Sequence, residues 1–137
     1  LIFLQIVFGA FVSGLDAGKL YQTWPLMNYH YFPDDIKIKN ILDLFNFDSH
    51  SLVQFYHRNI AYFISLYIIC LAYIIFKRKE KNLFKPIIYL VFILLVQICL
   101  GIFTLLSNLN IFIASFHQIT SVILILTALN LYYSSIK

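Results

Sequence analysis

Charged residues are scarce in this sequence, and so are cysteine, proline and glycine. Charged residues make up 12% of the 137 positions and hydrophobic residues 61%, against about 25% and about 45–50% in a typical soluble domain. A water-soluble globule of this length could not bury so much apolar side chain, and a disordered chain would not carry it, so we exclude both classes. The only two cysteines, Cys70 and Cys99, lie in separate apolar runs, which excludes a disulfide framework and a paired-cysteine site.

The longest uncharged stretch is too long for one membrane crossing. Residues 86–136 contain no Asp, Glu, Lys or Arg and are interrupted only by the polar turn 107–110. A crossing needs about 20 residues, so this stretch fits two helices joined by a tight turn. With two further apolar segments, the sequence predicts an all-α, polytopic membrane protein: a bundle of four transmembrane helices at about 1–14, 51–76, 86–106 and 110–134.

Basic residues gather in the connection 77–85, where five Lys and Arg stand beside one Glu. The positive-inside rule puts this loop on the cytoplasmic side of a bacterial inner membrane, or on the matrix side of a mitochondrial one. The loop also accounts for the net charge of +4, so membrane lipid is an expected partner and nucleic acid is not.

The long connection 15–50 is then predicted to lie on the outer side, together with the turn 107–110. Ile38, Ile41, Leu42 and Phe45 fall on one helical face, which predicts a short amphipathic helix on the membrane surface. Aromatic residues of the same connection are expected at the outer interface: Tyr21, Trp24, Tyr29, Tyr31 and Phe32.

The apolar segments contain an internal repeat. Residues 5–11 and 97–103 both read Q-I-x-x-G-x-F, and each is followed by a predicted helix that carries a histidine, His57 or His117. The chain therefore reads as one pair of helices used twice, with a glycine helix running outward and a histidine helix running inward.

His57 and His117 are the candidate site. Each lies six or seven residues after its predicted helix start, so both imidazoles should lie at the same depth on parallel helices. Ionisable groups within a membrane span usually have a function. Two imidazoles facing each other suit heme with two axial histidines, an iron without a vacant position that favours electron transfer. Copper or zinc also accepts imidazole, but no third ligand lies at that depth.

Small residues beside the histidines predict room for a flat ligand. Gly9 and Gly101 should lie at the level of the imidazoles, although close packing of helices in lipid explains them equally well. Arg58 is expected either to reach a heme propionate or to extend to the interface. His30 and His50 fall in the outer connection, where solvation is their expected state.

Four segments resemble the heme A synthase family. GAFVSGLDAG at 9–18 with YQTWPLM at 21–27 is similar to that family's GAxVAGLDAG…YNTWPLM, and VQFYHRNIAY at 53–62 is similar to its VQFxHRxxAY. QICLGIFTLL at 97–106 and FHQ at 116–118 resemble its QxxLGIxTLL and LHQ. The matches follow one another in the family's order over nearly the whole chain.

The resemblance implies a specific role. The family has eight membrane helices in two related halves, and residues 1–137 are similar to the C-terminal half, as a single four-helix heme-binding domain. His57 and His117 are then the ligands of a heme b iron. The implied oxidoreductase reaction converts a methyl group of heme O into the formyl group of heme A, with heme O synthase and terminal oxidase assembly factors as expected partners.

The same resemblance limits what this half is expected to do. The family's first half carries its own histidine pair and an acidic residue tied to substrate oxidation, so we expect no catalytic residue in residues 1–137 and no turnover by this half alone. The cysteine pair that some members carry in the outer loop has no counterpart in residues 15–50. Because the sequence begins with Leu1 inside an apolar run, we expect it to be a piece of a longer chain.

Two other functions stay open on the sequence. One is a membrane cytochrome b that carries electrons to or from quinone, with the same histidines but without biosynthetic activity. The other is a membrane anchor or small transporter without a cofactor. The GLDAG segment at 14–18 argues against the first, and the paired histidines argue against the second.

Overall fold

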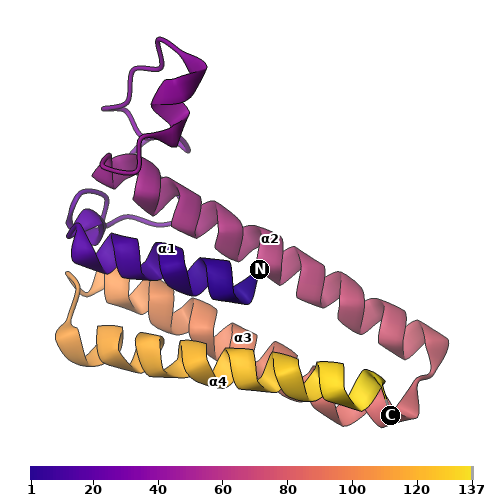
Figure 1. Ribbon diagram of the computed structural model, residues 1–137. Helices are drawn as coiled ribbons and strands as arrows, with labels where there is room; N and C mark the ends of the chain where they lie inside the picture. Colours follow the sequence, from indigo (N-terminus) through magenta and orange to yellow (C-terminus); the bar gives the residue numbers. More distant parts are fainter. Residues whose placement is uncertain (137) are drawn as a thin grey trace.

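The structure, a computed structural model, describes residues 1–136 and is helical throughout its regular parts. It contains four α-helices and two short 3-10 helices, η1 and η2, and no β-strand in that range (Figure 1). The prediction of an all-helical fold is confirmed. The elements are, in order, α1 (Ile2–Gly14), η1 (Ala17–Lys19), η2 (Ile41–Phe45), α2 (His50–Arg78), α3 (Lys81–Leu106) and α4 (Ile111–Ser135).

The four α-helices lie side by side in alternating directions. The end of α1, the start of α2 and the α3–α4 turn lie at one end of the bundle, which we call the loop end (left in Figure 1). The α2–α3 turn and the C-terminus lie at the other, which we call the basic end. α3 packs most extensively against α4, while α1 packs against α2 and α2 against α3. The bundle therefore consists of two helix pairs, α1–α2 and α3–α4, joined through α2 and α3.

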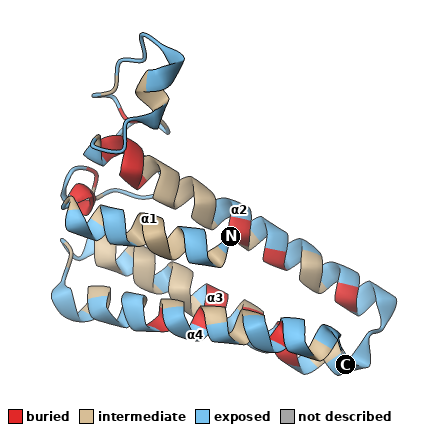
Figure 2. Cartoon of the chain, in the orientation of Figure 1, coloured by how far each residue is buried: buried red, intermediate tan, exposed pale blue. Residues whose placement is uncertain are grey.

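Three of the helices are long and apolar enough to cross a membrane. α2, α3 and α4 have 29, 26 and 25 residues, whereas α1 has 13, fewer than the roughly 20 that a crossing needs. The fourth crossing therefore stays a prediction. Large apolar side chains stand exposed along the three long helices, as expected for surfaces in contact with lipid tails (Figure 2): Phe63, Leu66, Phe92, Leu95 and Phe116.

The apolar core occupies the middle and the basic end of the bundle, away from the predicted site. It is formed by three isoleucines of α2 and by leucine and isoleucine side chains of α3 and α4: Ile64, Ile68, Ile75, Ile87, Leu90, Leu94, Leu124 and Leu131. These side chains pack without polar partners and hold the three long helices together. The half of the bundle toward the loop end buries a second set of apolar side chains, including Met27, Leu52 and Val53, beside polar contacts.

Among the four α-helices, only α4 begins with a side-chain cap, and the start of α3 differs from its prediction. The Asn110 side chain accepts hydrogen bonds from the backbone N–H groups of Phe112 and Ile113 and so caps α4. Pro86 was expected in the first turn of its helix, but α3 already begins at Lys81, so Pro86 lies in the second turn. The predicted start missed one turn because 81–85 is polar and basic, whereas the prediction followed the apolar run alone.

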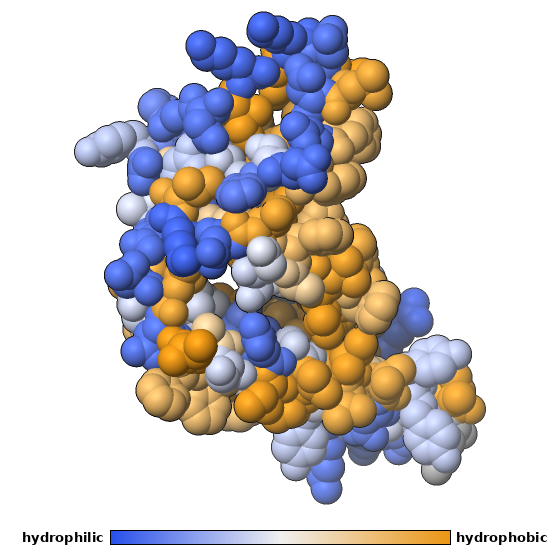
Figure 3. All heavy atoms as spheres, turned by 60° about the vertical axis from the view of Figure 1, so that its left-hand side comes forward, coloured by the Kyte–Doolittle hydropathy of each residue, from blue (hydrophilic) through white to orange (hydrophobic). Residues whose placement is uncertain are grey.

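The connection 15–50 differs from its prediction in two respects. Where an amphipathic helix was expected, the structure has the five-residue η2, whose Ile41, Leu42 and Phe45 are exposed. Tyr21 was expected at the membrane interface with the other aromatic residues, but it is buried, with 5% of its surface exposed. Hydrophilic residues gather over this connection, and hydrophobic residues cover the flank of the bundle below it (Figure 3).

Candidate functional site

His57 and His117 lie at matching levels of the bundle. His57 comes seven residues after the first residue of α2 and His117 six residues after the first residue of α4, and both helices start at the loop end. At 1.5 Å per residue, the two imidazoles lie about 10 Å along their helices. The structure thus places the two residues that the sequence singled out at the same level of the bundle.

In the first helix pair, α1 supplies a glutamine and a glycine to the His57 ring. Gln5 Nε2 lies 3.4 Å from His57 Nε2 and donates a hydrogen bond to the backbone carbonyl of His57 at 3.0 Å. A methyl group on Gly9 would lie 3.2 Å from His57 Cε1, so the missing side chain leaves room for the edge of the ring. His57 Nδ1 is buried and has no hydrogen-bond partner.

The second helix pair repeats this arrangement with α3 and α4. Gln97 Nε2 lies 3.5 Å from His117 Nε2, and a methyl group on Gly101 would lie 3.0 Å from His117 Cε1. One contact is additional: His117 Nδ1 donates a hydrogen bond to the backbone carbonyl of Gln97 at 3.1 Å. We call each set of glutamine, glycine and histidine a cradle; the first is Gln5, Gly9 and His57, and the second is Gln97, Gly101 and His117.

The cradles give the sequence repeat a structural meaning. The glutamine and glycine of Q-I-x-x-G are four residues apart, so they lie on one face of their helix and contact the same imidazole. The sequence assigned the space beside Gly9 and Gly101 to a flat ligand. In the structure the histidine rings fill that space, so the glycines position the ring directly.

Other potential metal-binding side chains do not form a cluster in the part of the chain that the structure describes. Within residues 1–136, no group of three or more His, Cys, Asp or Glu side chains comes together as a metal site. Cys70 and Cys99 are free and exposed. His30 and His50 stay apart from the cradles: His30 lies 2.6 Å from Asp34 in the outer connection, and His50 is the exposed first residue of α2.

Arg58, the neighbour of His57, holds the outer connection. Its guanidinium donates hydrogen bonds to the backbone carbonyls of Tyr21, Thr23 and Leu26, at 2.8, 2.9 and 3.3 Å. Gln54, one turn earlier on α2, donates to the same Tyr21 carbonyl at 2.8 Å. In the structure its guanidinium binds loop carbonyls, and the expected contact with a heme propionate or the membrane interface stays a prediction. The YQTWPLM and VQFYHR segments are therefore in contact.

Asp35 fixes the middle of the connection to the start of α2. Its carboxylate accepts hydrogen bonds from the Tyr21 hydroxyl at 2.6 Å and from the Ser51 hydroxyl at 2.5 Å. Burial acts to raise the pKa of Asp35, but these two hydrogen bonds outweigh it, and the pKa lies below its ordinary value. Burial and the hydrogen bond to Asp35 raise the pKa of Tyr21. The pair holds Tyr21 inside the loop end.

The connection also rests on the α3–α4 turn. Gln22 donates a hydrogen bond to the Asn108 side chain at 2.6 Å. Leu109 has a φ of 60°, which is unfavourable for a branched side chain, and it packs against Gly18, where a methyl group would lie 2.9 Å from Leu109 Cδ2. This contact explains the second glycine of the GLDAG segment, Gly18, and joins the two helix pairs at the loop end.

Sequence reasoning missed Asp35 and Ser51 as parts of this arrangement; it took Gln54 for a hydrogen-bonding residue between helices, whereas Gln54 binds the connection. No motif spacing marks an aspartate that bonds a tyrosine fourteen residues earlier. A usable signal existed for Gln54, because a glutamine three residues before a histidine on a predicted span faces the same side of the helix.

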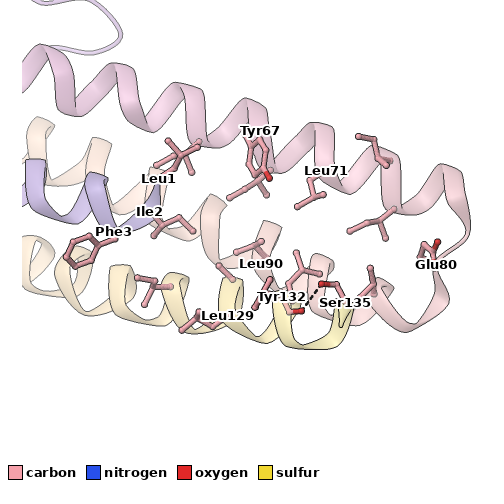
Figure 4. Close-up of a pocket in the computed structure, with 18 of the residues that line it drawn as sticks. Leu1, Ile2, Phe3, Tyr67, Leu71, Glu80, Leu90, Leu129, Tyr132 and Ser135 are labelled. Atoms are coloured by element: carbon pink, nitrogen blue, oxygen red, sulfur yellow. Dashed lines mark hydrogen bonds between the residues drawn. The ribbon is translucent and has the colours of Figure 1, made fainter. Parts of the chain in front are cut away.

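A cavity of about 790 Å³ extends from the start of α1, in the middle of the bundle, to the basic end (Figure 4). Apolar side chains of α2, α3 and α4 line it together with Leu1, Ile2 and Phe3, and Arg78 and Glu80 lie at its end. Its lining includes neither histidine of the cradles and is mostly apolar. Its chemistry is that of an apolar space between helices.

Comparisons with known proteins agree with the arrangement of motifs. Residues 1–129 match the COX15-CtaA family, described as cytochrome oxidase assembly protein. The heme A synthase of Pelagibacter ubique (strain HTCC1062) is 42% identical over 125 residues, covering 91% of this chain and 37% of that protein. The heme A synthase of Rickettsia massiliae (strain Mtu5) is 40% identical over 124 residues, covering 90% of this chain and 36% of that protein.

The heme A synthase of Rickettsia bellii (strain OSU 85-389) is 39% identical over 125 residues, covering 91% of this chain and 37% of that protein. The chain thus spans a little over a third of the length of the curated relatives that it matches. No solved structure matches it.

Proposed function

The chain belongs to the cytochrome oxidase assembly protein family that its residues 1–129 match, and from this membership we propose that it serves heme A biosynthesis as the heme-binding half of a heme A synthase. In this proposal, residues 1–137 form one integral membrane domain that corresponds to the C-terminal half of an eight-helix protein. The three long apolar helices support the membrane location.

The observation that carries the proposal is the pair of cradles. Two imidazoles at one level, each packed against a glycine and a glutamine, fit the axial ligands of one heme b. Buried polar atoms without partners accompany them: His57 Nδ1, Gln5 Oε1 and Gln97 Oε1. Gln54 Oε1 is a fourth such atom, one turn before His57 on α2. Buried polar groups are normally satisfied, so these unpartnered atoms support the proposal that a further group binds in this region.

Heme b held by His57 and His117 would supply one-electron transfer. The oxidation of a methyl group of heme O to the formyl group of heme A releases electrons, so such a carrier beside the reacting half has a use. The residues of this chain hold the iron, exclude water and keep the loop end closed. They include no acidic side chain beside the cradles that could act on substrate.

A membrane cytochrome b without biosynthetic activity is the competing function. Electron carriage alone does not need the contacts that tie YQTWPLM to α2, and the heme A synthase relatives weigh toward the biosynthetic role. The basic loop 77–85 on the cytoplasmic or matrix side, heme O as substrate, and contacts with heme O synthase or oxidase assembly factors belong to the same proposal.

The test is a reduced-minus-oxidised absorption spectrum of the full chain, purified in mild detergent from cells that make heme b. We expect the spectrum of a six-coordinate b-type heme, lost in His57→Ala and in His117→Ala. His50→Ala is the matched control, because His50 lies on the same helix as His57 but is exposed. A chain without heme, or an unchanged spectrum in both variants, would overturn the proposal.

The biosynthetic part needs a second measurement. Cells that contain heme O should form heme A only when the chain is expressed with the first half of a heme A synthase, and not with the chain alone. Formation of heme A by the chain alone would contradict the assignment of this chain to the non-catalytic half.

A further inference from the structure

The glutamine of each cradle contacts the ring nitrogen that faces it with an amide N–H, which can only donate. Gln5 Nε2 lies 3.4 Å from His57 Nε2, and Gln97 Nε2 lies 3.5 Å from His117 Nε2. A ring nitrogen that carries its own proton would be repelled by that donor. The contact is therefore favourable only if the histidine Nε2 is unprotonated and the proton is on Nδ1.

In each cradle a second contact supports this assignment, through the Gln5 amide in the first and the His117 ring in the second. The Gln5 NH2 group also donates to the His57 backbone carbonyl at 3.0 Å, so its nitrogen and not its oxygen must point that way. In the other cradle, the Gln97 backbone carbonyl accepts a hydrogen bond from His117, so the proton of that ring must be on Nδ1. Two different contacts thus lead to the same tautomer.

On this geometry, and resting on the proposed function, we propose that Gln5 and Gln97 are positioning residues that preset both histidines as Nδ1–H tautomers. In this tautomer Nε2 is unprotonated, accepts the amide N–H in the absence of heme, and would bind iron in its place. The glutamines act in the protein before heme arrives. Both Gln Oε1 atoms are buried without a hydrogen bond, so the amides are oriented toward the histidines at the expense of their own oxygens.

The hold on the two rings is unequal. The ring of His117 is fixed by a backbone carbonyl, which no side-chain substitution removes, whereas His57 Nδ1 has no partner and only Gln5 selects its tautomer. Loss of the Gln5 amide should therefore release His57, while loss of the Gln97 amide should leave His117 largely unchanged. A glutamine with a merely structural role would not produce this difference.

The experiment is nitrogen-15 NMR of the imidazoles in the full chain, labelled on histidine and purified in micelles without heme. His30→Gln and His50→Gln remove the two other signals. We expect Nδ1–H tautomers for His57 and His117 in this background. In Gln5→Met, which keeps the length of the side chain, His57 should become a mixture of tautomers; in Gln97→Met, His117 should not. Gln118→Met, beside His117 but exposed, is the control.

Heme titration of the same variants gives the second readout. We expect about twofold weaker binding in Gln5→Met, because about half of the His57 rings would then carry their proton on Nε2, and no change in Gln97→Met or Gln118→Met. An unchanged His57 tautomer in Gln5→Met overturns the positioning role, even if heme binds. Failure of the unsubstituted chain to bind heme, with the expected tautomers present, overturns the proposed function and leaves the tautomer assignment supported.

Discussion

The two helix pairs share their cradles and differ in almost everything at the loop end. α1–α2 and α3–α4 each hold a histidine against a glutamine and a glycine. The first pair is joined by the connection 15–50, with its two 3-10 helices, and the second by the turn 107–110. The pairs thus share the contacts of a glutamine and a glycine with a histidine. Only the first pair has a structured cover, the connection 15–50.

The cover is anchored on the histidine helix of its own pair. Arg58 and Gln54, on either side of His57, bind the Tyr21 carbonyl, and the corresponding region of α4 contains no charge. A charged side chain there is costly unless its donors are satisfied. Arg58 is satisfied by three backbone carbonyls, so the first pair uses it to close the loop end above His57.

The largest expected effect comes from filling the space beside a histidine, in either helix pair. Exchange of the outward glycine for a bulkier residue in either cradle, Gly9→Leu or Gly101→Leu, should displace the imidazole and abolish heme binding, because even a methyl group would lie 3.2 or 3.0 Å from the ring. Heme content of the purified chain measures this. Gly14→Leu is the control, since no atom lies within 4 Å of its added methyl group. Full heme content in both cradle variants would contradict the packing described.

Arg58→Ala should open the cover of the first pair and leave the second intact. Loss of three hydrogen bonds from a charged donor is expected to destabilise the closed connection by about 3 kcal/mol. Hydrogen exchange of residues 21–27 should then rise strongly, whereas that of 107–110 should change little. Arg78→Ala, at the exposed end of the same helix, is the control. Equal exchange in both variants would mean that the connection does not depend on Arg58.

The smaller substitution Gly101→Ala sharpens the comparison between the cradles. Its methyl group would approach His117 Cε1 to 3.0 Å, against 3.2 Å for Gly9→Ala at His57, so the α3–α4 pair should lose more thermal stability. Overpacking of this kind costs about 1–3 kcal/mol. Gly14→Ala, without a neighbour to contact, should not be destabilised. A larger loss in Gly9→Ala than in Gly101→Ala would reverse the order given by the geometry.

The smallest effect is a dependence on pH that only the first pair should show. The pKa of Asp35 is lowered in the folded chain from its ordinary 3.8, so its contribution is fully present above about pH 4 and is lost as the pH falls through the lowered value. Hydrogen exchange near Tyr21 should be insensitive to this group between pH 7 and 5 and should report loosening below pH 4.

Asp35→Asn removes that titration and should loosen the connection by about 1 kcal/mol already at neutral pH. Asp48→Asn, in the same connection, is the control. If the acid loosening near Tyr21 is the same in Asp35→Asn as in the unsubstituted chain, another group is responsible for it.

The sequence predicted the part of this molecule that depends on periodicity. Long apolar runs gave the three spanning helices, and the repeated Q-I-x-x-G-x-F pattern identified the helices that pack against His57 and His117. The basic loop 77–85 and the connection 15–50 were predicted to lie at opposite ends of the helices, and the structure places them so. The side of the membrane on which each end lies stays a prediction.

Contacts within the long connection could not be read in this way. Tyr21 looks like an interfacial aromatic by composition, and only the fold brings Asp35 and Ser51 to its hydroxyl. Likewise Arg58, a charge within a predicted span, has several plausible partners in sequence, and the three carbonyls that it binds belong to an irregular segment. Irregular backbone offers acceptors whose positions no periodic pattern encodes.

Electron paramagnetic resonance of the oxidised full chain loaded with heme b tests the central claim most directly. The account predicts one low-spin ferric heme per chain with two imidazole ligands, converted to a high-spin signal in His57→Ala and in His117→Ala alike. A high-spin heme in the unsubstituted chain, or a low-spin signal that survives both substitutions, would contradict the assignment of His57 and His117 as a shared pair of ligands.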